Sequence, residues 1–82
     1  MSSGPSRGAV WGRLGPPTEQ VGSVNDPRTR EEHGVRWNEK WIYLDEETGL
    51  PVRVVLWERY DLRGCFGACP DGEFRRESLG DG

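Results

Sequence analysis

Large apolar and polar side chains alternate along two runs in the middle of the chain, residues 35–44 and residues 51–62. The apolar set of the first run occupies odd positions and that of the second run even positions: Val35, Trp37, Trp41 and Tyr43, then Val52, Val54, Leu56, Tyr60 and Leu62. Successive side chains of a β-strand point to opposite faces, so this period of two predicts two strands. Because a short polar segment joins them, they are expected to form an antiparallel hairpin.

The apolar positions also predict how the two strands pair. Directly opposed residues of an antiparallel pair lie on the same face of the sheet. If the odd face of the first strand and the even face of the second share one core, Trp41 lies opposite Val54 and Tyr43 lies opposite Val52. The residues between the strands then form the turn, in which Gly49 adopts a positive φ. A shift of one residue would turn the tryptophans of the first strand to the other face.

The segments outside the hairpin carry less apolar character. Residues 1–33 contain few apolar side chains and several Gly-Pro, Pro-Pro and Asp-Pro pairs, which disfavour regular structure. They are expected to form a disordered N-terminal arm, and residues 78–82 a disordered tail. The sequence therefore predicts a small all-β domain over residues 34–77, an antiparallel β-hairpin or meander of two to four strands.

Turn chemistry after the hairpin predicts the further strands of this meander. Residues 69–73 read Cys-Pro-Asp-Gly-Glu, in which proline presets φ, aspartate bonds its own backbone and Gly72 takes the left-handed conformation. Such a turn would join a short third strand near residues 65–68 to a fourth near residues 73–77.

The composition limits the size of the core. A chain of 82 residues with 33% hydrophobic residues, 12 glycines and 6 prolines is expected to form one small domain. An isolated hairpin is not stable in water, so its apolar face needs further strands, a helix or a partner protein. No apolar run is long enough to span a membrane, and no secretory signal is visible. The chain is expected to be a soluble intracellular protein, cytoplasmic by default, and its oligomeric state is left open.

The second strand carries large side chains on the face that points away from the expected core. An aromatic ring, aliphatic side chains and arginines together are typical of the residues that dominate binding energy in protein interfaces. The predicted binding residues are those of this outer face, together with the one tryptophan of the N-terminal arm: Trp57, Val55, Arg53, Arg59, Ile42 and Trp11. Two alternatives stay open: a second layer of the protein covers Trp57, and Trp11 docks on the hairpin rather than on a partner. The prediction is a non-enzymatic protein–protein interaction module or small accessory subunit with a protein partner.

Cys65 and Cys69 form a CxxxC pair, which differs in spacing from the CxxC of redox and zinc motifs. In one extended strand their Cα atoms would lie about 13 Å apart, whereas a disulfide needs them within about 7 Å. A zinc ion takes four ligands, and the only histidine, His33, lies in the predicted arm. Free thiols, a disulfide and a metal site remain as alternatives. A thiol- or zinc-dependent protein is the second functional hypothesis, and no cofactor is predicted.

The charged residues favour neither catalysis nor nucleic-acid binding. A catalytic nucleophile needs a base and an orienting group, and nothing in the local sequence pairs His33 with a cysteine. The three consecutive carboxylates of residues 45–47 lie in the predicted turn, where solvated acidic side chains are common. Residues 34–82 carry 7 Lys and Arg against 10 Asp and Glu, and this net negative charge opposes binding to phosphate groups. Single-stranded nucleic-acid binding beside Trp57 is the third hypothesis, and no enzyme activity is expected.

One short segment resembles a known family. Residues 42–49 followed by Trp57 resemble the hairpin of WW domains, in which an aromatic residue, a short turn and a tryptophan follow one another. The chain departs from that pattern, because the interval from Thr48 to Trp57 is longer, no proline follows the tryptophan, and Trp37 lies too close to Tyr43. The resemblance extends to the hairpin alone and implies no function.

Overall fold

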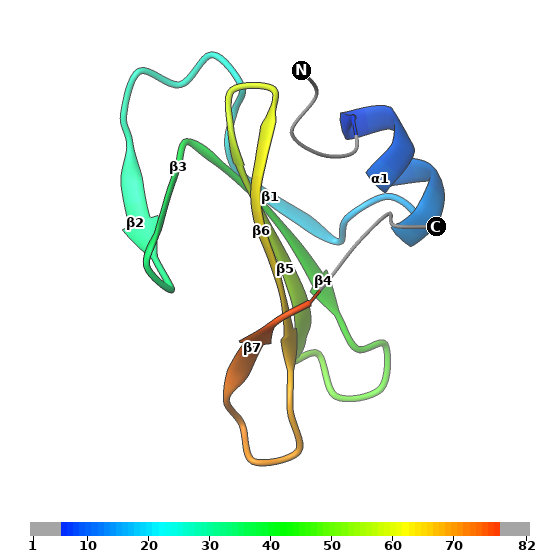
Figure 1. The fold of residues 1–82 in the computed structure, drawn as a ribbon. Coiled ribbons are helices and arrows are strands. Elements are labelled where there is room, and N and C mark those ends of the chain that lie inside the picture. Colours follow the sequence, from blue (N-terminus) through cyan, green and yellow to red (C-terminus); the bar gives the residue numbers. More distant parts are fainter. Residues whose placement is uncertain (1–5, 78–82) are drawn as a thin grey trace.

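The computed structural model describes residues 6–77, which form one helix and seven strands (Figure 1). In chain order these are α1 (Arg7–Leu14), β1 (Glu19–Gly22), β2 (Arg30–Glu32), β3 (Val35–Trp37), β4 (Glu39–Leu44), β5 (Pro51–Glu58), β6 (Asp61–Ala68) and β7 (Phe74–Arg76). Five strands form an antiparallel sheet in the order β1-β4-β5-β6-β7, and β2 and β3 form a separate antiparallel hairpin. The predicted small antiparallel β fold is therefore confirmed, but residues 6–77 form seven strands and not the two to four that were expected, because β1 and β2 are added and the first predicted strand is divided into β3 and β4. None of the described residues forms a helix long and apolar enough to span a membrane.

Strands β6 and β7 are the predicted third and fourth strands. Strand β6 begins at Asp61, four residues earlier than the turn chemistry indicated, and β7 lies within the predicted range. Gly72 has φ 87°, as the left-handed position of the turn requires, and Gly49 has φ 73° in the turn between β4 and β5. The predicted disordered tail, residues 78–82, lies outside the described residues.

Most of the predicted N-terminal arm is ordered, so the expectation of disorder is wrong for residues 6–33. Ser6 caps helix α1, because its side chain accepts a hydrogen bond from the backbone N–H of Ala9 (3.1 Å). Strand β1 pairs with β4, and β2 pairs with β3. Long-range contacts supply the order that the local sequence lacks: Val10 is buried, and the Tyr43 hydroxyl donates to the carbonyl of Gly15 (2.9 Å). Residues 1–5 of the arm lie outside the described residues.

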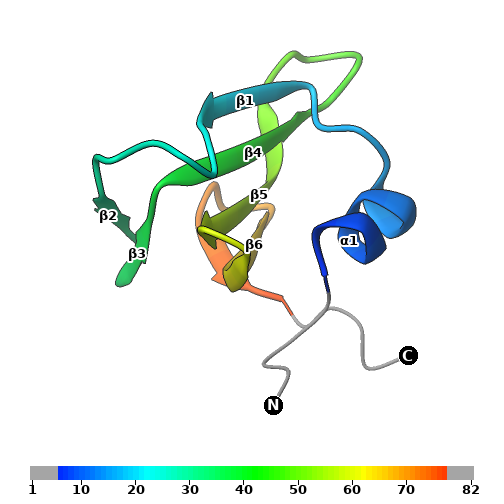
Figure 2. The same ribbon diagram turned by 90° about the horizontal axis from the view of Figure 1, so that it is seen from above.

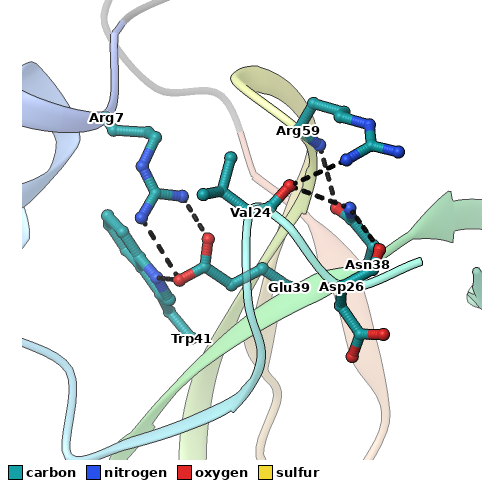
Figure 3. Close-up of polar contacts among 7 residues, drawn as sticks. All are labelled: Arg7, Val24, Asp26, Asn38, Glu39, Trp41 and Arg59. Carbon is teal, nitrogen blue, oxygen red and sulfur yellow. Dashed lines mark hydrogen bonds and ion pairs between the residues drawn. The ribbon is translucent and has the colours of Figure 1, made fainter. Parts of the chain in front are cut away.

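The first predicted strand is interrupted at Asn38, where the chain passes from the hairpin into the five-stranded sheet. Asn38 Nδ2 donates to the carbonyls of Val24 (3.3 Å) and Asp26 (3.2 Å), and Oδ1 accepts from the backbone N–H of Arg59 (2.8 Å) (Figure 3). These bonds hold the loop between β1 and β2 against the turn between β5 and β6. The tryptophans on either side of Asn38 therefore lie in different cores and not on one face.

The register of β4 and β5 differs from the predicted one by one residue. Trp41 lies opposite Val55, and Ile42 lies opposite Val54. A bulge at Tyr43 and the residue after it changes the pairing near the turn, because such a bulge places an extra residue in one strand. Odd residues of both strands therefore share a face, and the predicted pairing of odd with even residues is wrong.

Both faces of the five-stranded sheet are covered, each by a different element (Figure 2). On one side, which we term the helix face, the buried residues packed with α1 are Val10, Trp41, Tyr43, Val55, Trp57 and Cys65. On the other, the hairpin face, the buried residues packed with β2 and β3 are Val35, Trp37, Val54, Leu56 and Phe66. Strand β5 is consequently buried on both sides from Val54 to Trp57, which explains why its sequence there is a continuous apolar run.

Helix α1 is attached to the sheet by a partly buried ion pair (Figure 3). The Arg7 guanidinium forms two hydrogen bonds with the Glu39 carboxylate, one of them from Nη2 to Oε2 at 3.2 Å. Trp41 Nε1 donates to the same Oε2 at 2.9 Å. The guanidinium also lies over two indole rings, 5.1 Å from the centroid of Trp41 and 5.5 Å from that of Trp57. Because the Glu39 side chain is only 5% exposed, Arg7 is the cation that balances its charge.

Candidate binding groove

The hairpin of β2 and β3 covers only part of the hairpin face, and a groove lies beside it. The groove has a volume of about 360 Å³. Its lining residues come from β2, the turn after it, β4, β5 and β7: Glu32, His33, Lys40, Ile42, Pro51, Val54 and Phe74. Four of these seven side chains are apolar, so the groove presents a mainly hydrocarbon surface.

Strand pairing sets the floor and the walls of the groove. Ile42 and Val54 are directly opposed on adjacent strands, so they share the hairpin face and form its floor. Phe74 is placed on the same face by β7 and is half-buried. His33, in the turn of the β2–β3 hairpin, has φ 54°; its ring stacks on that of Phe66 with centroids 4.6 Å apart and lies 5.8 Å from that of Phe74. The turn therefore reaches Phe66 and Phe74 and leaves part of the sheet at Ile42 and Pro51 uncovered.

The charged side chains at the groove are arranged around its rim. Lys40 Nζ lies 3.0 Å from each carboxylate oxygen of Glu32, which ties the hairpin to β4. Arg76 of β7 lies over the Phe66 ring, 5.1 Å from its centroid, and donates to the carbonyl of Arg63 (3.4 Å). Among residues 6–77 no carboxylate pairs with Arg76. The rim thus holds one neutralised ion pair, and Arg76 lies near it over Phe66 without a carboxylate partner in the described part of the chain.

The four predicted binding residues of the second strand and its turn do not form one exposed surface. Trp57 and Val55 are both 0% exposed on the helix face, so the expectation that they face solvent is wrong. The shift of one residue in register moved them there, since it placed the odd residues of β5 beside Trp41. Arg53 pairs with Glu77 (Nε to Oε1, 2.8 Å). Arg59 Nη1 donates to a backbone carbonyl of the loop before β2.

The other two predicted binding residues keep exposed or groove-lining positions. Ile42 lies in the floor of the groove. Trp11 is 45% exposed on α1, and its ring meets that of Trp41 edge to face with centroids 5.7 Å apart. Trp11 therefore docks on the domain and still presents part of its surface to solvent.

The remaining residues of the groove could not be found from the sequence. His33 and Glu32 belong to the segment that was expected to be disordered, and Phe74 belongs to a strand of only three residues. Phe74 meets Ile42 through tertiary packing although they are 32 residues apart in the chain, and Glu32 and His33 reach the groove from a different hairpin. A local sequence signal for this group is absent, since neither spacing nor composition links its members.

Both cysteines are free thiols, Cys65 buried and Cys69 partly exposed. Burial, with a further contribution from the nearby Glu77 carboxylate, raises the pKa of Cys65 from 9.0 to about 11. The unfolded chain therefore releases this proton at lower pH than the folded one, and the associated stability, complete below pH 9, is lost as the pH rises towards 11. No group of three or more His, Cys, Asp or Glu residues within residues 6–77 is placed to hold a metal ion.

Native protein treated with iodoacetamide at pH 8 is expected to gain one adduct, at Cys69. Cys65 is 2% exposed, and a thiol with a pKa of about 11 is ionised to only about one part in a thousand at that pH. Intact mass and peptide mapping would locate the adduct, and protein unfolded in urea should gain two. Rapid labelling of Cys65 in the native protein would contradict this assignment.

One of the three carboxylates in the turn between β4 and β5, that of Asp45, has a structural role. Asp45 Oδ1 accepts hydrogen bonds from the backbone N–H groups of Glu47 (2.7 Å) and Thr48 (3.2 Å). This pattern closes an Asx turn, which is a common reason for aspartate at such a position. Asp45 therefore stabilises the connection between β4 and β5.

The fold and the groove together define a class: a small antiparallel β protein whose sheet is covered on both faces and hollowed by an apolar groove on one. Searches for similar proteins add no closer assignment, because no family model, no curated protein and no solved structure matches the chain. The geometry of the groove is therefore the feature of the molecule that bears most directly on its function.

Proposed function

We propose that the protein is a non-enzymatic protein–protein interaction module whose groove takes an apolar side chain from a segment of a partner protein. The observation that carries this proposal is the uncovered part of the hairpin face, where Ile42 and Val54 form an apolar floor beside Phe74 and the β2–β3 turn. Burying an apolar side chain there removes hydrocarbon surface of both partners from water, which is the main source of affinity in most interfaces.

The surroundings of the groove favour a protein segment over a small molecule. A volume of about 360 Å³ is at the lower end for small-molecule pockets, which measure roughly 300–1,000 Å³. Exposed apolar surface continues outside the groove at Val52, which is 39% exposed, and at Ala68 of β6. A chain segment can cover this neighbouring surface while one of its side chains fills the groove.

Peptides selected on the wild-type chain are expected to lose affinity when the groove is altered. The probe is a displayed library of random 12-residue peptides, and the variants are Ile42→Lys and Phe74→Ala. Each variant should weaken the selected peptides about 10- to 100-fold, because a buried apolar side chain contributes about 1.5–3 kcal/mol. Fluorescence anisotropy of labelled peptides would give the dissociation constants, and circular dichroism would check that each variant is folded.

Tyr60→Ala is the matched control for this experiment. Tyr60 is 71% exposed in the turn between β5 and β6, and it does not line the groove. Its removal should leave peptide affinity within about twofold of wild type. The proposal fails if no peptide is enriched, or if the enriched peptides bind folded Ile42→Lys and Phe74→Ala as tightly as wild type.

A further inference from the structure

Strand β7 forms one edge of the five-stranded sheet, next to the groove. It pairs with β6 on one side, and among residues 6–77 no strand pairs with its other side (Figure 1). Two of its three residues, Arg75 and Arg76, are exposed. Unpaired backbone groups on such an edge can form hydrogen bonds with an added strand.

The hydrogen bonds to β6 show which residues of this segment face outwards. The N–H of Glu77 donates to the carbonyl of Cys65, and the N–H of Cys69 donates to the carbonyl of Glu73, both at 2.7 Å. Alternate residues of an antiparallel strand direct their backbone groups to the same neighbour. Glu73 and Glu77 direct their backbone groups towards β6. Phe74 and Arg76, which alternate with them, therefore direct their N–H and C=O groups to the open side of the sheet.

The side chains of the same two residues lie on the hairpin face. Arg76 is paired with Phe66 in the sheet register and lies over its ring, and Phe74 lines the groove. An added strand would therefore place one side chain against Phe74, whose ring lines the groove. The side chain two residues away would lie beside Arg76, the guanidinium that has no carboxylate partner within residues 6–77.

The geometry points to strand addition at β7 by an extended segment of a partner protein that carries an apolar residue opposite Phe74 and a carboxylate opposite Arg76. This inference rests on the proposed function of the groove and specifies the segment that it takes. Directly opposed side chains of adjacent strands are in contact, so the two selective residues are separated by one position. In an antiparallel arrangement the acidic residue precedes the apolar one in the partner sequence, and in a parallel arrangement it follows.

Strand β1, at the opposite edge of the sheet, offers neither a cation for an acidic segment nor an accessible apolar side chain. Strand β1 places Glu19 on the hairpin face opposite Ile42, and this carboxylate would repel an acidic segment. Its apolar residue, Val21, is half-buried against the hairpin-face cluster. Charge and apolar surface thus both favour β7 as the edge that accepts a partner.

A selection experiment on the full chain tests the inference. The probe is a library of nine-residue peptides with alternating Thr and Val framework positions and three randomised central residues. On wild type we expect enrichment of Asp or Glu two positions from Leu, Ile, Met or Phe. On Arg76→Glu the preferred charged residue should change to Lys or Arg, with about a fivefold change in relative affinity for acidic against basic peptides.

Arg75→Glu is the matched control, because Arg75 is the neighbouring exposed arginine and lies on the opposite face of β7. It should retain the preference for acidic peptides. Hydrogen exchange gives an independent readout: the amides of Phe74 and Arg76 should gain protection when an enriched peptide binds. N-methylation of the peptide amides that face β7 should abolish that protection and weaken binding at least tenfold.

The outcomes separate this inference from the proposed function. If selected peptides require Ile42 and Phe74 but are indifferent to Arg76→Glu and protect neither amide, strand addition is wrong and the groove remains a binding site. If no selected peptide depends on Ile42 or Phe74, the proposed function itself is wrong. Concentration-dependent dimerisation of the wild-type chain that Arg76→Glu abolishes would show that a second copy occupies the edge, which also overturns the inference.

Discussion

Replacing Trp57 with alanine is expected to unfold most of the protein at room temperature. Trp57 is 0% exposed, and its ring lies 5.1 Å from that of Trp41 in the centre of the helix face. Removing a buried tryptophan costs about 3–5 kcal/mol, which is comparable with the whole stability of about 3–5 kcal/mol that a domain of this size achieves. Trp41 is 1% exposed and belongs to the same cluster, so Trp41→Ala should have a similar effect. Near-ultraviolet circular dichroism and urea titration would measure both losses.

Trp11→Ala is the matched control, since this tryptophan is 45% exposed and meets the cluster only at its edge. We expect it to lower the free energy of unfolding by about 1 kcal/mol, the size of an aromatic pair contribution. A Trp57→Ala variant with native circular dichroism and a wild-type urea midpoint would contradict the observed register. It would also restore the expectation that Trp57 is a surface residue available to a partner.

The second large effect is expected at the ion pair between helix α1 and the sheet. Arg7→Leu removes the cation that balances Glu39 and leaves a carboxylate that is 5% exposed. Breaking a buried pair by removing one partner costs about 3–5 kcal/mol, because the remaining charge stays desolvated. The loss of unfolding free energy in Arg7→Leu should fall at the lower end of that range, since Arg7 is itself 26% exposed and water can reach the site in the variant. Urea denaturation followed by tryptophan fluorescence would measure the change.

A double variant distinguishes a charge effect from a packing effect at this site. Adding Glu39→Gln to Arg7→Leu removes the buried charge, while the amide oxygen can still accept the bond from Trp41 Nε1. More than half of the lost stability should return, and the double-mutant cycle gives the coupling between the two residues. Arg13→Leu, an exposed position of the same helix, should change stability by less than about 0.5 kcal/mol. Equal losses for Arg7→Leu and the double variant would show that packing of α1, and not charge, is what the substitution disturbs.

The two faces of the sheet allow stability and binding to be tested separately. The helix face holds Trp41, Trp57 and the Arg7–Glu39 pair, whereas the groove and Arg76 lie on the hairpin face. Variants of the groove can therefore be compared with wild type without disturbing the larger tryptophan cluster. This separation is also why Trp57, although it has the composition of an interface residue, is unsuited as a probe of binding.

Several features of the fold can be predicted from short stretches of sequence. Alternating side chains predicted the extended conformation of the central residues, and turn chemistry predicted the positive φ of Gly49 and Gly72. The burial of Trp41 followed from the same pattern. These features depend on neighbouring residues, whose steric and polar preferences act whatever the rest of the chain does.

The sequence by itself determined a small antiparallel β protein with strands, turns and a tryptophan core near their final positions. Only the tertiary structure decided the register, the order of residues 6–33 and the groove. Strand β5 has apolar residues of both parities from Val54 to Trp57, so its pattern fits either face and does not select a register. That choice was made by α1 and the β2–β3 hairpin, which cover opposite faces through contacts between segments far apart in the chain. The groove is the part of the hairpin face that the β2–β3 hairpin leaves uncovered. No local sequence pattern shows how far that hairpin extends over the sheet.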